Sequence, residues 1–143
     1  MRQTYRVLGY LIAIGVVVQA AAIAAAWFLT INDIDDGLVV DKDYDGNWGH
    51  ALHGMVGMMV IPLIALVLFI VSFFAKFDGA VKWAGFTLIA VVVQVMLAFL
   101  SFGIPALGAL HGINAFIVAG LGAQCGRAAS EPATREPAPT VAA

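Results

Sequence analysis

Four long runs of apolar residues, separated by short polar segments, account for most of the sequence. They cover approximately residues 7–29, 49–75, 83–101 and 105–123, and none of them contains Asp, Glu, Lys or Arg. A helix needs about 20 mostly apolar residues to cross a bilayer, whereas the helices of a soluble bundle carry a polar face. The pattern therefore predicts an all-α integral membrane protein, a four-helix bundle in which the chain runs up-down-up-down.

Composition also indicates that lipid is the main solvent. Hydrophobic residues make up 62% of the chain and charged residues only 11%, whereas soluble domains carry about 25% charged residues. The net charge of −2 gives no indication of a nucleic-acid partner. We expect one four-helix transmembrane domain over residues 1–127. Prolines and scattered charges predict a disordered cytoplasmic tail over residues 128–143.

The basic residues predict the orientation of the bundle. Lys and Arg concentrate on the cytoplasmic side of membrane proteins, and six of the seven basic residues fall on one side of the predicted bundle: Arg2, Arg6, Lys76, Lys82, Arg127 and Arg135. The seventh, Lys42, lies in an acidic loop over residues 30–48. We expect a plasma-membrane protein with both termini in the cytoplasm and this loop outside. A cleaved signal peptide is disfavoured, because the first apolar run exceeds the roughly 7–15 residues of a signal sequence.

Two short motifs occur twice in the same order. Val-Val-Val-Gln ends at Gln19 and again at Gln94, and Ala-Leu-His-Gly contains His53 and later His111. The two Gln-to-His spacings differ by about the length of the acidic loop. This pattern predicts a tandem two-helix repeat whose halves are parallel and related by an axis along the membrane normal. Chance matches in a Val/Ala/Leu-rich sequence are the alternative.

The repeated histidines are the strongest candidates for a functional site. Ionisable residues inside a membrane are costly and indicate function by default. His53 and His111 lie at similar depth in the second and fourth helices, which are diagonal neighbours in such a bundle. Neutral imidazole is an axial ligand of haem iron, so the pair predicts a haem b site. The alternative is that each histidine only forms hydrogen bonds between helices.

Five further residues are assigned to the same site: His50, Gln19, Gln94, Gly54 and Gly112. The two glycines leave room for the edge of a porphyrin. A ligating histidine usually donates its other N–H to an acceptor, and backbone carbonyls or the two glutamines could serve. The glutamines could also bind a quinone carbonyl, or only join helices. His50 is either a substitute ligand, a partner for a haem propionate or a solvated residue at the membrane surface.

The outer loop contains the beginning of a calcium-loop pattern. Asp41, Asp43 and Asp45 stand at alternate positions and Gly46 follows them, as in the first half of such a loop. Leu52 stands where the pattern has a bidentate Glu. A weak calcium site is one interpretation of this loop, and a solvated acidic loop is the favoured one.

With these histidines, the chain resembles the four-helix haem-binding modules of heme A synthase over roughly residues 7–125. In that family each half carries one His on its second helix and one on its fourth, which correspond to His53 and His111 here. This chain has one four-helix unit, no outer-loop cysteine pair and no Glu one turn before His53. The resemblance therefore implies haem b binding and not the oxidation of a farnesylated haem.

These observations predict an electron-transfer module or a subunit of a membrane redox complex, more an electron carrier than a stand-alone enzyme. Membrane lipid and a quinone or redox complex are the expected partners. The alternative is a non-redox accessory or assembly protein whose histidines only pack helices. A transporter is disfavoured, because no charged residue within the apolar runs marks an ion path.

Overall fold

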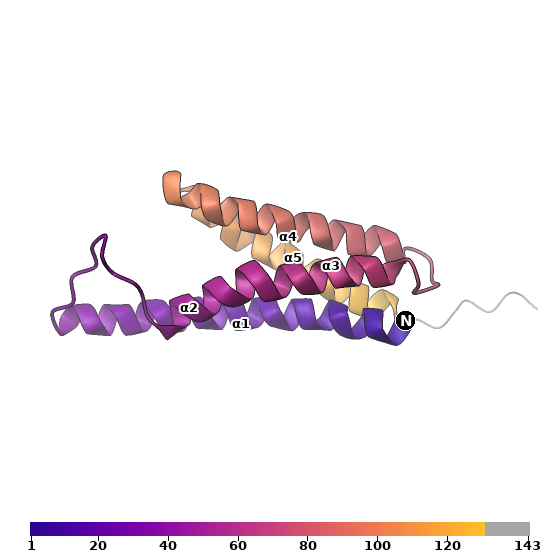
Figure 1. The fold of residues 1–143 in the computed structure, drawn as a ribbon, viewed down its shortest axis with the longest axis horizontal. Helices are drawn as coiled ribbons and strands as arrows, with labels where there is room; N and C mark the ends of the chain where they lie inside the picture. The colour runs from indigo at the N-terminus through magenta and orange to yellow at the C-terminus, as the bar shows by residue number, and fades with distance from the viewer. Residues whose placement is uncertain (131–143) are drawn as a thin grey trace, which may run out of the picture.

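The computed structural model describes residues 1–130 and consists of helices and their connections (Figure 1). In chain order the elements are α1 (Arg2–Asp35), α2 (Trp48–Met55), the π-helical η1 (Val56–Val60), α3 (Ile61–Ser72), α4 (Ala80–Gly103) and α5 (Leu107–Ala128). Because α2, η1 and α3 form one continuous rod, there are four long helices in the described part of the chain. Each is long and apolar enough to cross a membrane, which confirms the all-α, four-helix prediction.

The helices extend further than the apolar runs. Helix α1 continues to Asp35, so the outer connection is shorter than residues 30–48. It ends where Gly37 adopts a φ of +104°, a conformation that side chains other than glycine rarely adopt. Helix α5 includes Ala128, the first residue of the predicted disordered tail, and residues 131–143 of that tail lie outside the described residues.

The second rod changes its helical repeat in the middle. The N–H of Ile61 donates to the carbonyl of Val56, five residues earlier, as in a π-helix. Pro62 follows directly and has no N–H to donate to the carbonyl of Met58. A π segment adds one residue to a helical turn. The face that α2 presents to its neighbours is therefore rotated relative to the face that α3 presents.

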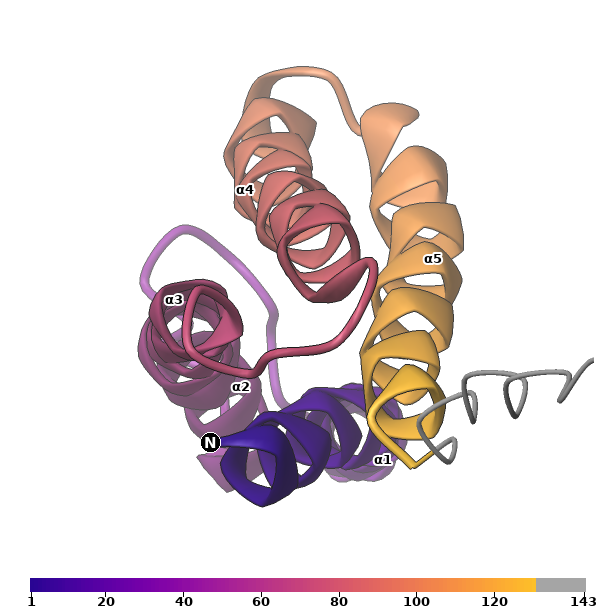
Figure 2. The ribbon, with the colours of Figure 1, turned by 90° about the vertical axis from the view of Figure 1, so that its right-hand side faces the viewer.

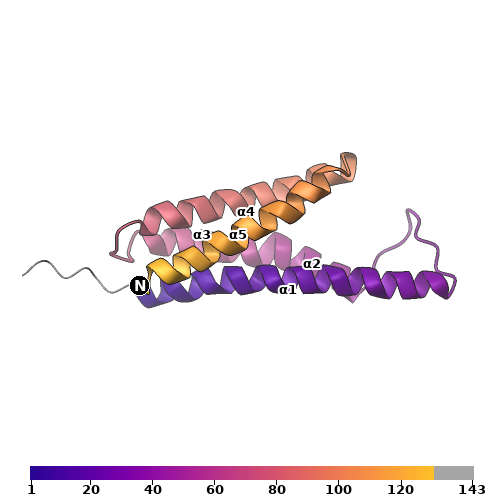
Figure 3. The ribbon, with the colours of Figure 1, turned by 180° about the vertical axis from the view of Figure 1, so that it is seen from behind.

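The N-terminus and the 73–79 connection lie at one end of the bundle, and the 36–47 and 104–106 connections lie at the other (Figures 1 and 3). We call the second of these the loop end. Viewed along the bundle, the four rods surround a common centre (Figure 2). Helices α1 and α5 approach each other closely. A Cβ added at Gly9 would lie 2.8 Å from the carbonyl oxygen of Gly122, and one added at Gly122 would lie 2.9 Å from that of Gly9.

Most of the packed core lies in the half of the bundle away from the loop end, although α1 also buries Ala22, Ala26 and Thr30 towards that end. In α4 the last buried residue is Val91, and in α5 the first is Asn114. Helix α2 buries only Gly49. Towards the loop end, α4 and α5 diverge from α1 and α2 (Figures 1 and 3). The two helical hairpins, α1 with the second rod and α4 with α5, therefore bury fewer residues against each other towards the loop end.

Polar groups join the helices at the packed end. The Tyr5 hydroxyl donates to the carbonyl of Ala80 at 2.9 Å and lies 3.3 Å from Sγ of Cys125. The hydroxyl of Thr87 lies 3.4 Å from the same sulfur and 2.9 Å from the carbonyl of Trp83, to which it donates. These contacts connect α1, α4 and α5, and the sequence patterns above did not predict them.

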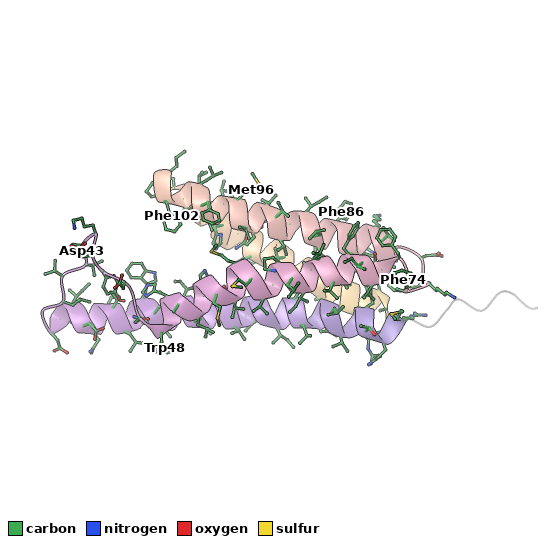
Figure 4. All side chains as sticks on the ribbon, in the orientation of Figure 1. Asp43, Trp48, Phe74, Phe86, Met96 and Phe102 are labelled. Atoms are coloured by element: carbon green, nitrogen blue, oxygen red, sulfur yellow. The ribbon has the colours of Figure 1, made fainter. Side chains whose placement is uncertain are left out.

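The outside of the bundle is covered with large apolar side chains. Figure 4 labels several of them, among them Phe74, Phe86, Met96 and Phe102. All four are exposed, and Phe102 has 86% of its surface accessible. Such a continuous apolar exterior is expected where hydrocarbon replaces water around the helices.

Candidate functional site

The structure brings the two repeated histidines together at the edge of the packed core. His53 on α2 and His111 on α5 face each other with their ring centroids 6.2 Å apart and their planes inclined at 61°. Both side chains are partly buried. They lie where the two hairpins begin to diverge, so neither ring is enclosed in a close-packed core.

Each histidine is tied to the preceding helix of its own hairpin by the same hydrogen bond. Nδ1 of His53 lies 3.1 Å from the backbone carbonyl oxygen of Gln19, and Nδ1 of His111 lies 3.0 Å from that of Gln94. A carbonyl oxygen can only accept, so Nδ1 carries the proton in both rings. In a neutral ring the lone pair then lies on Nε2, which is the tautomer that binds a metal through that atom.

A second set of hydrogen bonds surrounds His111. The side-chain nitrogen of Asn114 donates to the carbonyl of Ala90 at 2.9 Å and to Oε1 of Gln94 at 2.8 Å. Nε2 of Gln94 lies 3.1 Å from Nε2 of His111. Since the backbone carbonyls of Ala90 and Gln94 can only accept, every donor in this network is determined. The amide of Gln94 must therefore donate to Nε2 of His111.

The side chain of Gln19 has no comparable partner. Only 8% of its surface is accessible, and within residues 1–130 its Nε2 atom is buried without a hydrogen bond. Its Oε1 atom lies 2.8 Å from the point where a Cβ at Gly57 would stand, so only glycine fits there without displacing this amide. The asymmetry between the two glutamines was not predicted. Alignment of the two halves on their histidines would have indicated it.

The glycines that follow the paired histidines face open space. A Cβ added at Gly54 or Gly112 would meet no atom within 4 Å. Each of these glycines follows one of the paired histidines directly in sequence. The prediction that they leave room for the edge of a flat ligand is compatible with this geometry.

His50 performs a different role from the pair. Its Nδ1 accepts from the backbone N–H of Asn47 at 3.2 Å, and the Asn47 side chain accepts from the N–H of Gly49, which together cap α2. The ring also packs edge-to-face on Trp27 and Tyr44, with centroid distances of 5.4 and 6.1 Å. Nε2 of a neutral His50 must then carry the proton, which is the opposite tautomer to that of the pair.

The aspartates of the outer loop are not assembled around a common point. Within residues 1–130 no three His, Cys, Asp or Glu side chains are grouped as metal ligands. Asp43 pairs with Lys42 at 2.7 Å, and its N–H donates to the carboxylate of Asp41. The structure therefore does not bring Asp41, Asp43 and Asp45 together as the calcium interpretation requires.

No protein-family model, curated protein sequence or solved structure matches this chain. The resemblance to heme A synthase therefore rests on His53, His111 and the four-helix pattern alone.

Proposed function

We propose that this protein binds one b-type haem in the membrane, with His53 and His111 as its two axial ligands. The observation that carries the proposal is the 6.2 Å separation of two rings whose Nδ1 atoms are both tied to backbone carbonyls. If both Nε2 atoms bound one metal from opposite sides, with bonds of about 2 Å, the ring centroids would lie roughly 6 Å apart. Imidazole pairs are established axial ligands of haem iron.

Three features of the site support this fit. The Nδ1 hydrogen bonds fix both rings in the tautomer that ligates through Nε2. The open space at Gly54 and Gly112 accommodates a flat macrocycle. The apolar walls of the diverging hairpins suit a porphyrin better than a hydrated ion, because ions lose too much hydration energy there.

Haem, when bound, supplies one-electron chemistry at a potential set by its ligands and surroundings. The residues of this chain would fix the tautomer of the two ligands, orient their rings and keep the site within an apolar layer. We propose that the protein serves as an electron-transfer module or a subunit of a membrane redox complex. A quinone is the proposed lipid-soluble partner.

We further propose an up-down-up-down topology in the plasma membrane with both termini in the cytoplasm. The site would then lie near the outer surface. The bias of Lys and Arg supports this orientation. We also propose that the two hairpins arose by duplication, which the matching bonds from His53 to Gln19 and from His111 to Gln94 support.

The direct test is a reduced-minus-oxidised visible spectrum of the protein purified from cells supplied with haem. We expect Soret and alpha bands of a non-covalent haem b at about one per chain, because no Cys-x-x-Cys-His attachment motif occurs. A spectrum without these bands would contradict the proposal and favour a non-redox accessory protein. In that case the hydrogen bonds of both histidines would serve only to join helices.

A further inference from the structure

We propose that the two haem ligands are not equivalent, and that the Gln94 amide makes His111 an exchangeable ligand. His53 would hold the iron permanently, and the position that His111 leaves would take a small neutral diatomic ligand such as carbon monoxide. This inference rests on the proposed haem site and assigns a further binding site within it.

The hydrogen-bond network around His111 carries the inference. Nε2 of His111 is the only ring atom with a lone pair, and the Gln94 amide donates to it at 3.1 Å. The same lone pair would have to bind the iron. The amide and the iron therefore compete for one atom of His111.

Asn114 holds the competing amide in place. Its side-chain nitrogen is anchored on the carbonyl of Ala90 and also donates to Oε1 of Gln94. Only 9% of Asn114 is accessible, so this anchor is nearly removed from solvent. The Gln94 amide therefore stays directed at His111 instead of turning towards the lipid.

His53 has no such competitor. Its Nε2 atom makes no hydrogen bond within the described residues, and Val56 stands where the other half has Asn114. The side chain of Gln19, the counterpart of Gln94, makes no hydrogen bond there either. Of the two imidazoles, that of His53 is therefore the one ready to bind without breaking an existing contact.

Ligand exchange follows from this arrangement without any redox step. If His53 held a haem, His111 would give up the opposite position without transfer of an electron or a proton, because its Nε2 lone pair would return to one N–H of the Gln94 amide. A diatomic ligand would supply its own lone pair to the position that His111 leaves. The second N–H of the Gln94 amide would remain available to donate to that ligand.

The test compares Gln94→Ala with Gln124→Ala in the haem-loaded protein. Gln124 belongs to the same helix as His111, but its side chain accepts from Arg127 at the other end of the bundle. For each variant, haem content, the affinity of the reduced protein for carbon monoxide and the C–O stretching frequency are measured. Asn114→Leu serves as a second variant, because it releases the Gln94 amide without removing it.

We expect the wild type and Gln124→Ala to bind carbon monoxide alike. Gln94→Ala and Asn114→Leu should retain haem but bind carbon monoxide about fivefold more weakly, the factor to which one net hydrogen bond corresponds. The C–O stretch should also move to higher frequency in Gln94→Ala as its hydrogen bond is lost. A wild type that holds haem but binds no carbon monoxide would overturn this inference alone, as would unchanged affinity in both variants. A wild type without haem would instead overturn the proposed function.

Discussion

Val56 occupies, three residues after His53, the position that Asn114 occupies three residues after His111. Asn114 donates one hydrogen bond to Oε1 of Gln94 and one to the carbonyl of Ala90, whereas valine can donate none to Gln19. One apolar residue thus leaves Gln19 without the donor that orients Gln94, and Nε2 of Gln19 is buried without the acceptor that His111 provides to Gln94.

The first prediction is that Val56→Asn stabilises the protein. The side-chain nitrogen of the new residue should donate to Oε1 of Gln19, as that of Asn114 donates to Oε1 of Gln94 in the other hairpin. Interhelical hydrogen bonds in membrane proteins contribute about 0.6 kcal/mol on average and up to about 1.7 kcal/mol. Unfolding in mixed micelles with increasing denaturing detergent measures the gain. Val56→Leu, which adds no polar group, is the control, and equal stability of the two variants would contradict the explanation.

The second prediction concerns the ligands. His53→Ala should lose most of the haem and His111→Ala a smaller share, because both are proposed iron ligands but only His53 is proposed to hold the iron throughout. His50→Ala should retain nearly all of it, since the His50 ring caps α2 and packs on Trp27. Haem content per chain in purified protein gives the comparison. Loss of haem in His50→Ala with retention in His53→Ala would show that His50, and not His53, is the ligand on α2.

The four helices could be predicted from the sequence, because an uncharged run of about 20 apolar residues indicates a membrane-spanning helix. It also placed His53 and His111 at a similar depth, since the two Ala-Leu-His-Gly motifs begin parallel helices in the same way. It could not predict where α1 ends. Residues 30–35 are compatible with a helix, and only the conformation of Gly37 decides the end.

The hydrogen bonds of the site could not be predicted from the sequence, for a different reason. The π segment at Val56–Val60 rotates α2 relative to α3, and this rotation determines which groups the beginning of the second rod presents. A pattern of apolar residues carries no information on such a local change. The network of Asn114 also depends on the carbonyl of Ala90, a backbone group that any residue would provide.

The third prediction tests the close contact of α1 with α5. Gly122→Ala should destabilise the bundle, because its Cβ would lie 2.9 Å from the carbonyl oxygen of Gly9 and the helices would have to separate. Overpacking of this kind typically costs about 1–3 kcal/mol. Gly120→Ala, two residues earlier in the same helix, meets no atom within 4 Å and should be neutral or slightly stabilising. Detergent unfolding of both variants checks the difference, and equal losses would contradict a close contact at Gly122.

The fourth prediction separates the stability of the loop end from haem binding. Asn47→Ala removes a side chain that accepts from Gly49 and donates to the carbonyl of Ala26, so α2 loses its cap and its attachment to α1. Loss of such a cap costs about 1 kcal/mol. We expect lower resistance to unfolding with nearly unchanged haem content. A loss of haem as large as that in His53→Ala would show that the cap, and not the ligand alone, positions the site.

The fifth prediction is the topology, on which the side of the proposed site depends. Single cysteines at Lys42 and Asp78, in a Cys125→Ala background, sample the two ends of the bundle. Both positions are exposed, whereas the neighbouring Ala80 is buried and unsuitable for labelling. On intact cells an impermeant thiol reagent should label position 42 and not position 78, because Lys and Arg are retained on the cytoplasmic side.

Permeabilised cells provide the control for this labelling, since both positions should then react. Labelling of position 78 but not 42 on intact cells would reverse the orientation and move the histidine pair to the cytoplasmic half of the membrane. The pair lies towards the loop end that contains Lys42, so its side of the membrane follows from the same measurement. An electron partner would then have to be sought on the cytoplasmic face, where the Asp-rich connection would also lie.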